Sequence, residues 1–410
     1  MIIKGPTYID GEIMMRYIGI DDGKVSFVKR ALKTTEEVFD WDGVILPAGT
    51  DMHVHFRDPG HTKKEDFFTG TLSAAHGGIT TIADMPNNDP PTNSLSRLKN
   101  KISMCSKKAC VDFFLYGMLS EEAEDMLTET RLFKVFLSDT TGVEKNRDLK
   151  IASKVVFDSG GLVAFHCESD ELFGEPGEDL AGYNKERPKE SEVRAIESLR
   201  EWPKGRKHVC HITSEEGLKA AREVGAHTEV TPHHLFFTDE VILDSFGKVN
   251  PPLRGDSNHF SMWEHFERGN FDVMASDHAP HLEAEKAVEF SQAPAGLPGV
   301  ETTFPLMMSA VAMGRIDLTT VVDMISYRPA RLLGIQKGKI EEGYDADLAL
   351  FDFREIEPIS SDRLHSKCGW SPYEGSPGIF PRHVICRGEF VVKNRRSTTS
   401  GGRGRYLFTP

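Results

Sequence analysis

Histidine is the residue type whose placement first indicates chemistry in this sequence. The 410-residue chain has 16 histidines, and several lie at the ends of short apolar runs. His53 and His55 are two residues apart, so they point to the same side of an extended strand. His166 and His211 end two later runs, and Asp277 ends another. Imidazole nitrogen and carboxylate oxygen without thiolate suit zinc, with cobalt or manganese as weaker candidates.

A lysine lies inside the fourth apolar run. Lys134 is flanked by Phe133 and Val135, which predicts burial, although a long side chain can also extend to the rim of a sheet. A desolvated amine favours its neutral, nucleophilic form and can add carbon dioxide to become a carbamate. The two carbamate oxygens would bridge two cations about 3.5–4 Å apart, which can share a hydroxide and polarise a carbonyl group together.

The apolar runs number eight and alternate with longer amphipathic segments. They are VILPAGTDMHVHF, ITTIADMP, VDFFLYGM, LFKVFLS, LVAFHCES, HVCHITS, HTEVTPHH and FDVMASDHA. Eight buried strands separated by helices favour an α/β fold of the (β/α)8 TIM-type barrel over a doubly wound sheet. The carboxyl ends of barrel strands form the active-site face, so the four histidines, Lys134 and Asp277 are predicted to converge there.

The two ends of the chain have a different texture, with short strands and tight turns. Asp22-Gly23 is typical of a hairpin turn, and strand character returns after residue 335. We therefore predict a small β-sandwich domain, formed by residues 1–46 and 340–410, beside a catalytic barrel of residues 47–339. The Gly- and Arg-rich segment 397–410 is expected to be a flexible or loosely docked end.

Composition excludes several classes of protein. Hydrophobic residues make up 39% and charged residues 27% of the chain, which excludes a disordered or collagen-like protein. The net charge of −14 is opposite in sign to that of a typical binder of nucleic acid or of anionic membranes. Six cysteines without a CxxC pair indicate a reducing cytoplasm, and Asp10 and Glu12 interrupt any signal-peptide core. No apolar run approaches the ~20 residues of a membrane helix.

Two motifs resemble the signatures of the dihydroorotase family. They are DMHVHFRDPG at residues 51–60 and ASDHAPH at residues 275–281. Further segments similar to that family are MPNN (85–88), VNPPLR (249–254) and PGVET (298–302). The resemblance extends from about residue 44 to 385 with the order of motifs kept. The family belongs to the amidohydrolase superfamily, whose members share a metal-bearing barrel and often a small β domain built from both termini.

The resemblance implies two zinc ions in each subunit. The implied ligands are His53, His55, Lys134, His166, His211 and Asp277. Asp277 would bind the more buried ion together with the two N-terminal histidines, and carboxylated Lys134 would bridge both ions. Some bacterial members of the family use an aspartate as the bridge, which leaves Asp139 as the alternative.

Dihydroorotate carries a carboxylate beside a cyclic ureide. Arg57 lies two residues beyond His55, and a planar guanidinium reads a carboxylate with two parallel hydrogen bonds, although a surface salt bridge with Asp58 is the alternative. The other implied substrate residues are Asn87 and His281 at the carboxylate, Asn250 near the ring amide, and Thr140 or Thr141 in a closing loop. That loop also fits an ordinary strand-to-helix turn.

The implied activity is the reversible hydrolysis of (S)-dihydroorotate to N-carbamoyl-L-aspartate, run as ring closure in pyrimidine biosynthesis. Asp277 would take the proton of the attacking hydroxide and pass it to the departing ring nitrogen.

Two alternatives stay open: a dihydropyrimidinase, hydantoinase or allantoinase, whose substrates lack the carboxylate, and a non-catalytic scaffold for aspartate transcarbamoylase. A homodimer and an association with aspartate transcarbamoylase are also left open. A cytoplasmic protein without nucleic-acid or membrane partners is expected.

Overall fold

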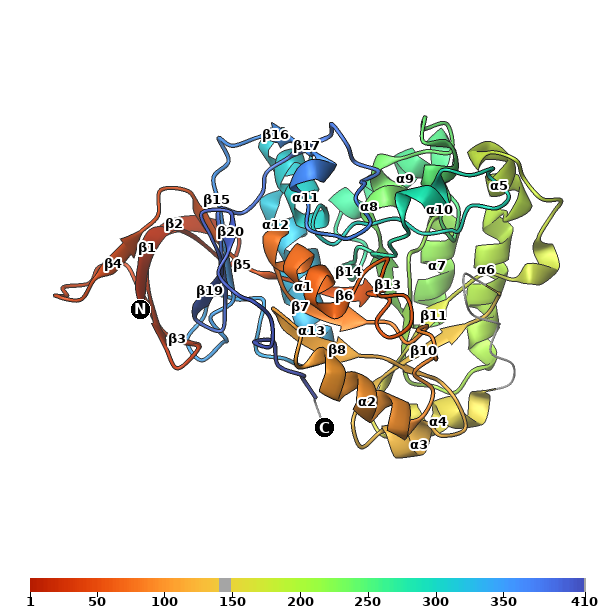
Figure 1. Cartoon of the computed structure of the whole chain (residues 1–410), viewed down its shortest axis with the longest axis horizontal. Helices are drawn as coiled ribbons and strands as arrows, with labels where there is room; N and C mark the ends of the chain where they lie inside the picture. Colours follow the sequence, from red (N-terminus) through yellow and green to blue (C-terminus); the bar gives the residue numbers. More distant parts are fainter. Residues whose placement is uncertain (140–148, 409–410) are drawn as a thin grey trace.

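A computed structural model describes residues 1–139 and 149–408 of the chain (Figure 1). Its centre is a set of eight parallel strands, and each predicted apolar run contains or overlaps one of them. The strands are β6 (Gly49–Val54), β7 (Ile79–Asp84), β8 (Asp112–Leu115), β10 (Leu132–Phe136), β11 (Leu162–His166), β12 (Arg206–Val209), β13 (His227–Val230) and β14 (Val273–Met274).

The eight strands close into a barrel. β6, β7 and β8 pair in that order, and β9 (Gly117–Met118) continues the line of β8 and pairs with β10. β10 to β14 then follow in chain order. The ring is closed by a parallel bridge between Val54 and His278, where the His55 amide donates to the His278 carbonyl at 2.8 Å. The predicted α/β barrel is therefore confirmed.

Successive side chains of the barrel strands point alternately outward and inward, which gives two apolar clusters. Outward residues such as Phe133 and Phe165 join the large core between strands and helices, while Leu162 and Ala164 belong to a smaller cluster inside the barrel. Lys134 points to the same interior and is fully buried. The barrel interior is therefore a packed core, as expected for this architecture.

Helices cover the outside of the barrel (Figure 1). The longer ones are α1 (Phe67–His76), α2 (Leu95–Cys105), α4 (Lys150–Asp158), α6 (Lys189–Ser198), α7 (Glu215–Glu223), α9 (Asp256–Glu267) and α11 (Thr303–Ala312). The shorter ones are α3 (Ala123–Met126), α5 (Leu180–Glu186), α8 (Pro232–Phe236), α10 (Glu283–Lys286), α12 (Leu318–Val322) and α13 (Arg328–Leu333), with single turns at η1 (Asp170–Leu172), η2 (Leu199–Glu201), η3 (Asp244–Gly247) and η4 (Asp323–Tyr327).

The two ends of the chain share one strongly curved sheet beside the barrel (Figure 1). Its strands are β1 (Ile2–Ile9), β2 (Glu12–Asp21), β3 (Lys24–Lys29), β4 (Val38–Asp40), β5 (Val44–Pro47), β15 (Leu348–Phe351), β18 (His383–Cys386), β19 (Glu389–Lys393) and β20 (Arg396–Ser397). The N- and C-terminal parts meet where β5 pairs antiparallel with β15. Ile3 and Ile18 from one end pack in the same apolar cluster as Leu348 and Ile385 from the other.

Two C-terminal segments leave this sheet and pack on the barrel. Residues 352–382, here called the strap, contain β16 (Glu357–Pro358), η5 (Ser361–Arg363) and β17 (Pro377–Gly378) and lie beside α11 (Figure 1). Near the end of the chain, the Phe113 amide donates to the Arg405 carbonyl at 2.9 Å and the Leu407 amide to the Phe113 carbonyl at 2.8 Å. The expected loose end is thus wrong for residues 405–407, because backbone pairing holds them along β8.

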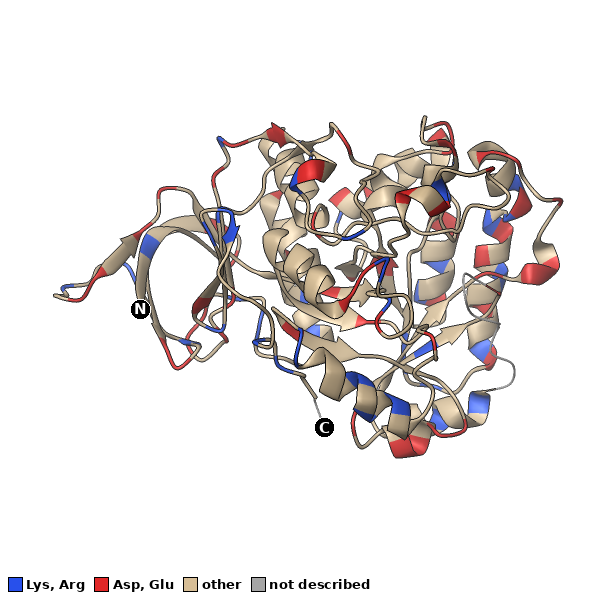
Figure 2. Cartoon of the chain, in the orientation of Figure 1, with Lys and Arg blue, Asp and Glu red and all other residues tan. Residues whose placement is uncertain are grey.

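The outer surface mixes charges of both signs. Along α4, α6 and α7, acidic and basic segments alternate (Figure 2), and pairs such as Lys154–Asp158 and Arg200–Glu223 connect them. Exposed pairs of this kind contribute at most about 1 kcal/mol each. Within residues 1–139 and 149–408, no helix combines the length and the apolar character that crossing a membrane requires.

A buried ion-pair cluster joins barrel strand β8 to the terminal sheet, and it generates the first prediction. Lys337 Nζ lies 2.8 Å from Asp112 Oδ2 and also contacts Asp347, and all three side chains are at least 98% buried. Arg387 Nε also pairs with Asp112 at 3.0 Å, so Lys337→Met should leave Asp347 without its ammonium partner and Asp112 with Arg387. We expect the free energy of unfolding to fall by about 3 kcal/mol, as measured by urea denaturation.

Lys339→Met is the matched control for that prediction. Lys339 is two residues away and pairs with exposed Asp10 at 3.5 Å, so its loss should cost less than about 1 kcal/mol. Equal stability of the two variants would contradict the role given to the buried cluster.

Candidate metal and substrate site

The carboxyl ends of the strands surround a pocket at the mouth of the barrel. The predicted site residues that line this pocket are His53, His55, Arg57, Asn87, Lys134, His166, His211, Asn250 and Asp277. These residues come from seven of the eight strands or from the loops that follow them. The structure thus brings together residues up to 224 positions apart in the sequence, as the barrel topology predicts.

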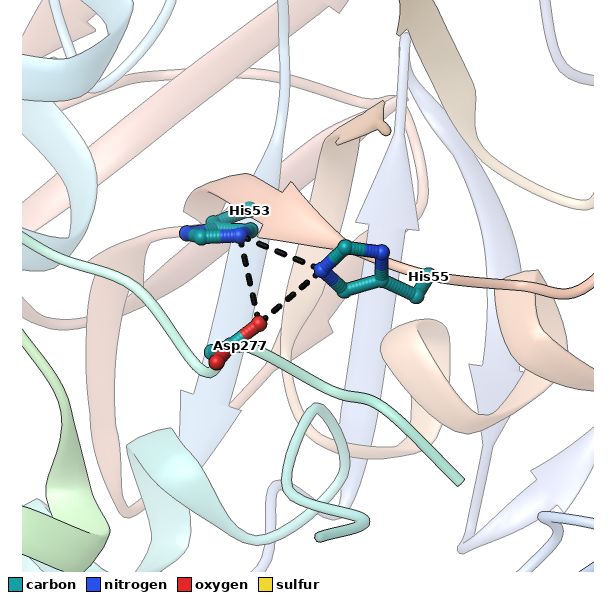
Figure 3. A group of neighbouring side chains, drawn as sticks. All are labelled: His53, His55 and Asp277. Atoms are coloured by element: carbon teal, nitrogen blue, oxygen red, sulfur yellow. Dashed lines mark hydrogen bonds and ion pairs between the residues drawn. The ribbon is translucent and has the colours of Figure 1, made fainter. Parts of the chain in front are cut away.

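Three donor atoms at one side of the pocket face one another (Figure 3). His53 Nε2 lies 3.2 Å from His55 Nε2 and 3.2 Å from Asp277 Oδ1, and His55 Nε2 lies 3.1 Å from Asp277 Oδ1. Bond lengths of 2.0–2.1 Å around a tetrahedral zinc ion place its donors about 3.3 Å apart. The triangle therefore has the size and the donor chemistry that binding of a metal ion needs.

A second pair of imidazoles lies across the pocket. His166 Nδ1 is 3.0 Å from His211 Nε2, and both rings are buried. Lys134 reaches the same space from β10, where its Nζ lies 3.0 Å from Cys210 Sγ. Lys134 thus lines the same pocket as both groups of histidines.

The electrostatics of the first group favour a cation at its centre. Burial lowers the pKa of His53, but the carboxylates of Asp277 and Glu229 outweigh burial and raise it to about 10. The neighbouring His55 behaves oppositely: burial lowers its pKa to about 4 although Asp277 opposes the shift. The side of the His53 ring that faces Asp277 is thus a position where a positive charge is stabilised.

Buried carboxylates behind the histidines fix their orientation. Glu229 Oε1 lies 2.8 Å from His53 Nδ1 and also accepts from the His211 amide at 2.9 Å. Glu168 Oε2 lies 2.8 Å from His166 Nε2, and Arg187 clamps Glu168 through two hydrogen bonds of 3.0 and 2.6 Å. Such carboxylate partners select the tautomer of a ligating histidine and hold its ring.

Sequence reasoning assigned no role to Glu168 or Arg187. Glu168 follows His166 by two residues, so the alternation that pairs His53 with His55 also places Glu168 beside His166. Arg187 carries no comparable signal, because it approaches from the end of α5. Glu229 and Cys210 also lie beside pocket residues, Glu229 at His53 and Cys210 at Lys134.

Three pocket residues have an unusual backbone conformation. Arg57, His211 and Asp277 have φ angles of +57°, +37° and +46°. This left-handed conformation costs roughly 1–2 kcal/mol for a residue other than glycine. Strained residues of this kind cluster at functional sites, where the surrounding structure holds them in place.

Arg57 is a buried guanidinium that faces the pocket. Its side chain is 93% buried, its Nε donates to the Pro280 carbonyl at 3.2 Å, and burial lowers its pKa to about 10, which leaves it charged at neutral pH. Within residues 1–139 and 149–408, no carboxylate oxygen lies within 4.0 Å of its guanidinium nitrogens. The alternative partner, Asp58, instead pairs with Lys108 at 2.6 Å.

The other residues predicted to bind the substrate differ in their surroundings. Asn87 Oδ1 accepts from His55 Nδ1 at 2.6 Å, which leaves its amide nitrogen for the pocket, and Asn250 Oδ1 accepts from the Tyr183 hydroxyl at 2.5 Å. His281 lies behind Arg57, with its Nε2 3.2 Å from Arg57 Nη2, and it is not part of the pocket wall.

The loop after β10 is described only in part. Asp139 is exposed, whereas Lys134 is buried in the pocket, so the geometry favours Lys134 over Asp139 as a bridge. Thr140 and Thr141, which sequence analysis assigned to a closing loop, lie outside the described residues.

Comparison with known proteins agrees with this geometry. The model of the amidohydrolase family matches residues 44–391, so the chain belongs to the amidohydrolase family. Within that family it groups with the dihydroorotases. It is 35% identical to the dihydroorotase of Methanosarcina mazei, over 98% of this chain and 95% of that one. It is 37% identical to the dihydroorotase of Thermoplasma volcanium, over 95% and 94% of the two chains.

Solved structures with the same fold carry another name. L-hydantoinase (dihydropyrimidinase) from Arthrobacter aurescens superposes with a TM-score of 0.92 at 26% identity, covering 100% of this chain and 99% of that one. A D-hydantoinase superposes with a TM-score of 0.89 at 27% identity, over 99% and 98% of the two chains. The shared fold thus extends to enzymes named for other cyclic amides.

The amidohydrolase family is metal-dependent, and the described residues contain donor groups for metal ions. The second prediction concerns the support of these donors. Glu229→Gln removes the charge that orients His53 and should weaken zinc retention about 10- to 100-fold, measured as zinc that remains after titration with a chelator.

Glu223→Gln provides the control, because Glu223 is an exposed residue of α7 that pairs with Arg200. It should retain zinc like the unaltered protein. If Glu229→Gln also retained zinc fully, Glu229 would not be a positioning residue of the site.

Proposed function

We propose that the protein is a dihydroorotase that interconverts (S)-dihydroorotate and N-carbamoyl-L-aspartate. The observation that carries the proposal is Arg57: a buried, charged guanidinium without a carboxylate partner among the described residues, on the wall of a pocket that also holds the metal-donor group. A buried cation needs an anion, and the substrate carboxylate supplies it with two parallel hydrogen bonds. The dihydroorotase relatives support the same assignment.

Two zinc ions are proposed as the cofactors, bridged by carboxylated Lys134. The ligands would be His53, His55 and Asp277 for one ion and His166 and His211 for the other. When bound, the ions would supply a nucleophilic hydroxide near neutral pH and polarise the amide carbonyl. Carboxylation would replace the ammonium of Lys134, which lies among four histidines, with a group of opposite charge. That reversal of charge is what a pocket for two cations needs.

Asp277 is proposed as the group that moves the proton. Its Oδ1 lies beside His53 and His55. Although burial opposes it, the charge of His53 and the hydrogen bond with His55 hold the pKa of Asp277 well below its usual range. The carboxylate is therefore ionised and can accept the proton of the attacking hydroxide. In hydrolysis Asp277 then donates that proton to the departing ring nitrogen, and in ring closure the transfer runs in reverse.

The remaining polar residues are proposed to orient the substrate. Arg57 and Asn87 would bind the carboxylate from two sides. His281 would complete this group from behind Arg57, where Lys64 Nζ donates to its Nδ1 at 3.2 Å. Asn250, fixed by the hydroxyl of Tyr183, would contact the ring amide. Thr140 and Thr141 are retained as the proposed contacts of a closing loop.

The third prediction separates this function from a hydantoinase or dihydropyrimidinase activity, which the solved structural relatives favour. Arg57→Met should lower kcat/KM for dihydroorotate about 30-fold to several thousand-fold, because truncating one partner of a buried charge pair costs about 2–5 kcal/mol. Turnover of dihydrouracil, which has no carboxylate, should stay at the level of the unaltered protein.

Arg200→Met is the control for this experiment, since Arg200 forms only surface ion pairs. It should leave both activities unchanged. A protein that prefers dihydrouracil, hydantoin or allantoin to dihydroorotate would refute the proposed substrate.

The fourth prediction concerns Lys134. Protein stripped of metal should regain several-fold more activity when zinc is returned with bicarbonate than in buffer freed of carbon dioxide, because the carbamate needs carbon dioxide. Lys134→Gln, which has no amine to carboxylate, should recover in neither buffer. Equal recovery of the unaltered protein in both buffers would argue against carboxylation.

The proposal extends to the organisation and location of the protein. Residues 47–339 would be the catalytic barrel, and residues 1–46 and 340–410 the small β-sandwich domain, supported by the sheet that both ends share. A cytoplasmic location agrees with six cysteines that are all unpaired. A homodimer and an association with aspartate transcarbamoylase stay predictions of the family resemblance.

A further inference from the structure

A second cluster of metal-binding side chains lies away from the pocket, where the strap meets the barrel. It consists of His76 at the end of α1, Glu301 just before α11, and His365 of the strap. One donor atom of each residue lies within 4.8 Å of the others. None of the three lines the pocket at the barrel mouth. The cluster is therefore separate from the proposed reaction centre.

The contacts within this cluster leave one donor unused. His365 Nδ1 lies 2.7 Å from Glu301 Oε1, and the His365 amide donates to Glu301 Oε2 at 2.8 Å. The ring of His76 stacks on that of His365 with centroids 3.6 Å apart. His76 is 93% buried, yet no described residue forms a hydrogen bond with its Nε2. A buried imidazole nitrogen without a partner is costly unless it meets a ligand.

An open space adjoins the unused donor. All three residues line a cavity of about 280 Å³, together with strap residues such as Arg363 and Leu364. Arg363 pairs with Glu357, and Arg395 pairs with both Glu357 and Glu355, so the cations at the wall of the cavity already have carboxylate partners. Glu301 and the two imidazoles are thus the groups left to bind a positive ion.

We propose that His76, Glu301 and His365 form an additional binding site for a divalent transition-metal ion of the zinc class. Two imidazoles and one carboxylate are a ligand set that zinc accepts, with a fourth position open towards the cavity. Donors around a tetrahedral zinc are about 3.3 Å apart. Because the rings of His76 and His365 are stacked at an interplanar angle of 21°, binding of an ion requires that one ring rotate out of the stack.

The site would tie three separate segments together. Beyond His365, the strap contacts Glu65 through Ser366, and Trp370 Nε1 donates to the carbonyl of His281 at 2.8 Å. An ion at the cluster would therefore fasten the strap over the side of the barrel that carries His281. The inference rests on the cluster alone and does not depend on the substrate of the pocket.

Zinc content measured on the full chain tests the proposal. The unaltered protein, His365→Asn, His76→Asn and the control His265→Asn are saturated with zinc, desalted and analysed by inductively coupled plasma mass spectrometry. His265 lies on α9, outside both metal-donor clusters. The two cluster variants should each carry about one zinc per chain fewer than the unaltered protein and the control, with turnover of dihydroorotate retained.

Two results would overturn the inference. Equal zinc content in all four proteins would show that the cluster binds no zinc, and loss of zinc together with all turnover would assign the lost ion to the barrel mouth. If His76→Asn does not fold, His365→Asn alone tests the proposal. The side chain of His365 is 30% exposed, so its replacement removes less packing. If the unaltered protein does not turn over dihydroorotate, the zinc count still decides this inference while the proposed substrate fails.

Discussion

The site depends on one connection, which joins the first and the last strand of the barrel at their carboxyl ends. Asp51 on β6 accepts hydrogen bonds from the Ser276 amide at 3.2 Å and from the His53 amide at 3.1 Å. Burial raises the pKa of Asp51 to about 6. Because Ser276 directly precedes Asp277, this carboxylate fixes the distance between Asp277 and the two histidines of β6. Closure of the barrel and assembly of the metal-donor triangle are therefore one structural event.

From that connection outwards, the site is built in successive layers of contacts. The donors His53 and His166 are each oriented by a buried carboxylate, and Glu168 is in turn held by Arg187. The left-handed backbone at Arg57, His211 and Asp277 is tolerated because these layers leave little alternative. The folded scaffold thus holds the metal-donor side chains and the guanidinium of Arg57 in place before a ligand binds, so binding requires little rearrangement of these groups.

Much of this arrangement is predictable from the sequence, for reasons specific to each residue. The alternation of β-strands places His53 beside His55, and barrel topology gathers the polar ends of eight apolar runs at one face, which covers Lys134 and Asp277. The roles of Arg187 and of the tail could not be predicted, because each depends on a long-range approach that leaves no local pattern. His281 matches a motif, but only the structure places it behind Arg57. The position of Asp139 at the surface likewise follows from a loop whose path the sequence does not define.

The sheet shared by both ends of the chain has a consequence for how the protein is made. β5 pairs with β15, whose residues follow about 300 positions later in the chain. During synthesis, the edge of β5 that β15 will cover therefore stays unpaired until almost the whole protein has been translated. Exposed strand edges are templates for unwanted pairing, and contacts of such long sequence separation form slowly. The barrel can gather its strands in chain order, whereas the terminal sheet must wait, so the newly made N-terminal strands are the part of this chain most in need of protection.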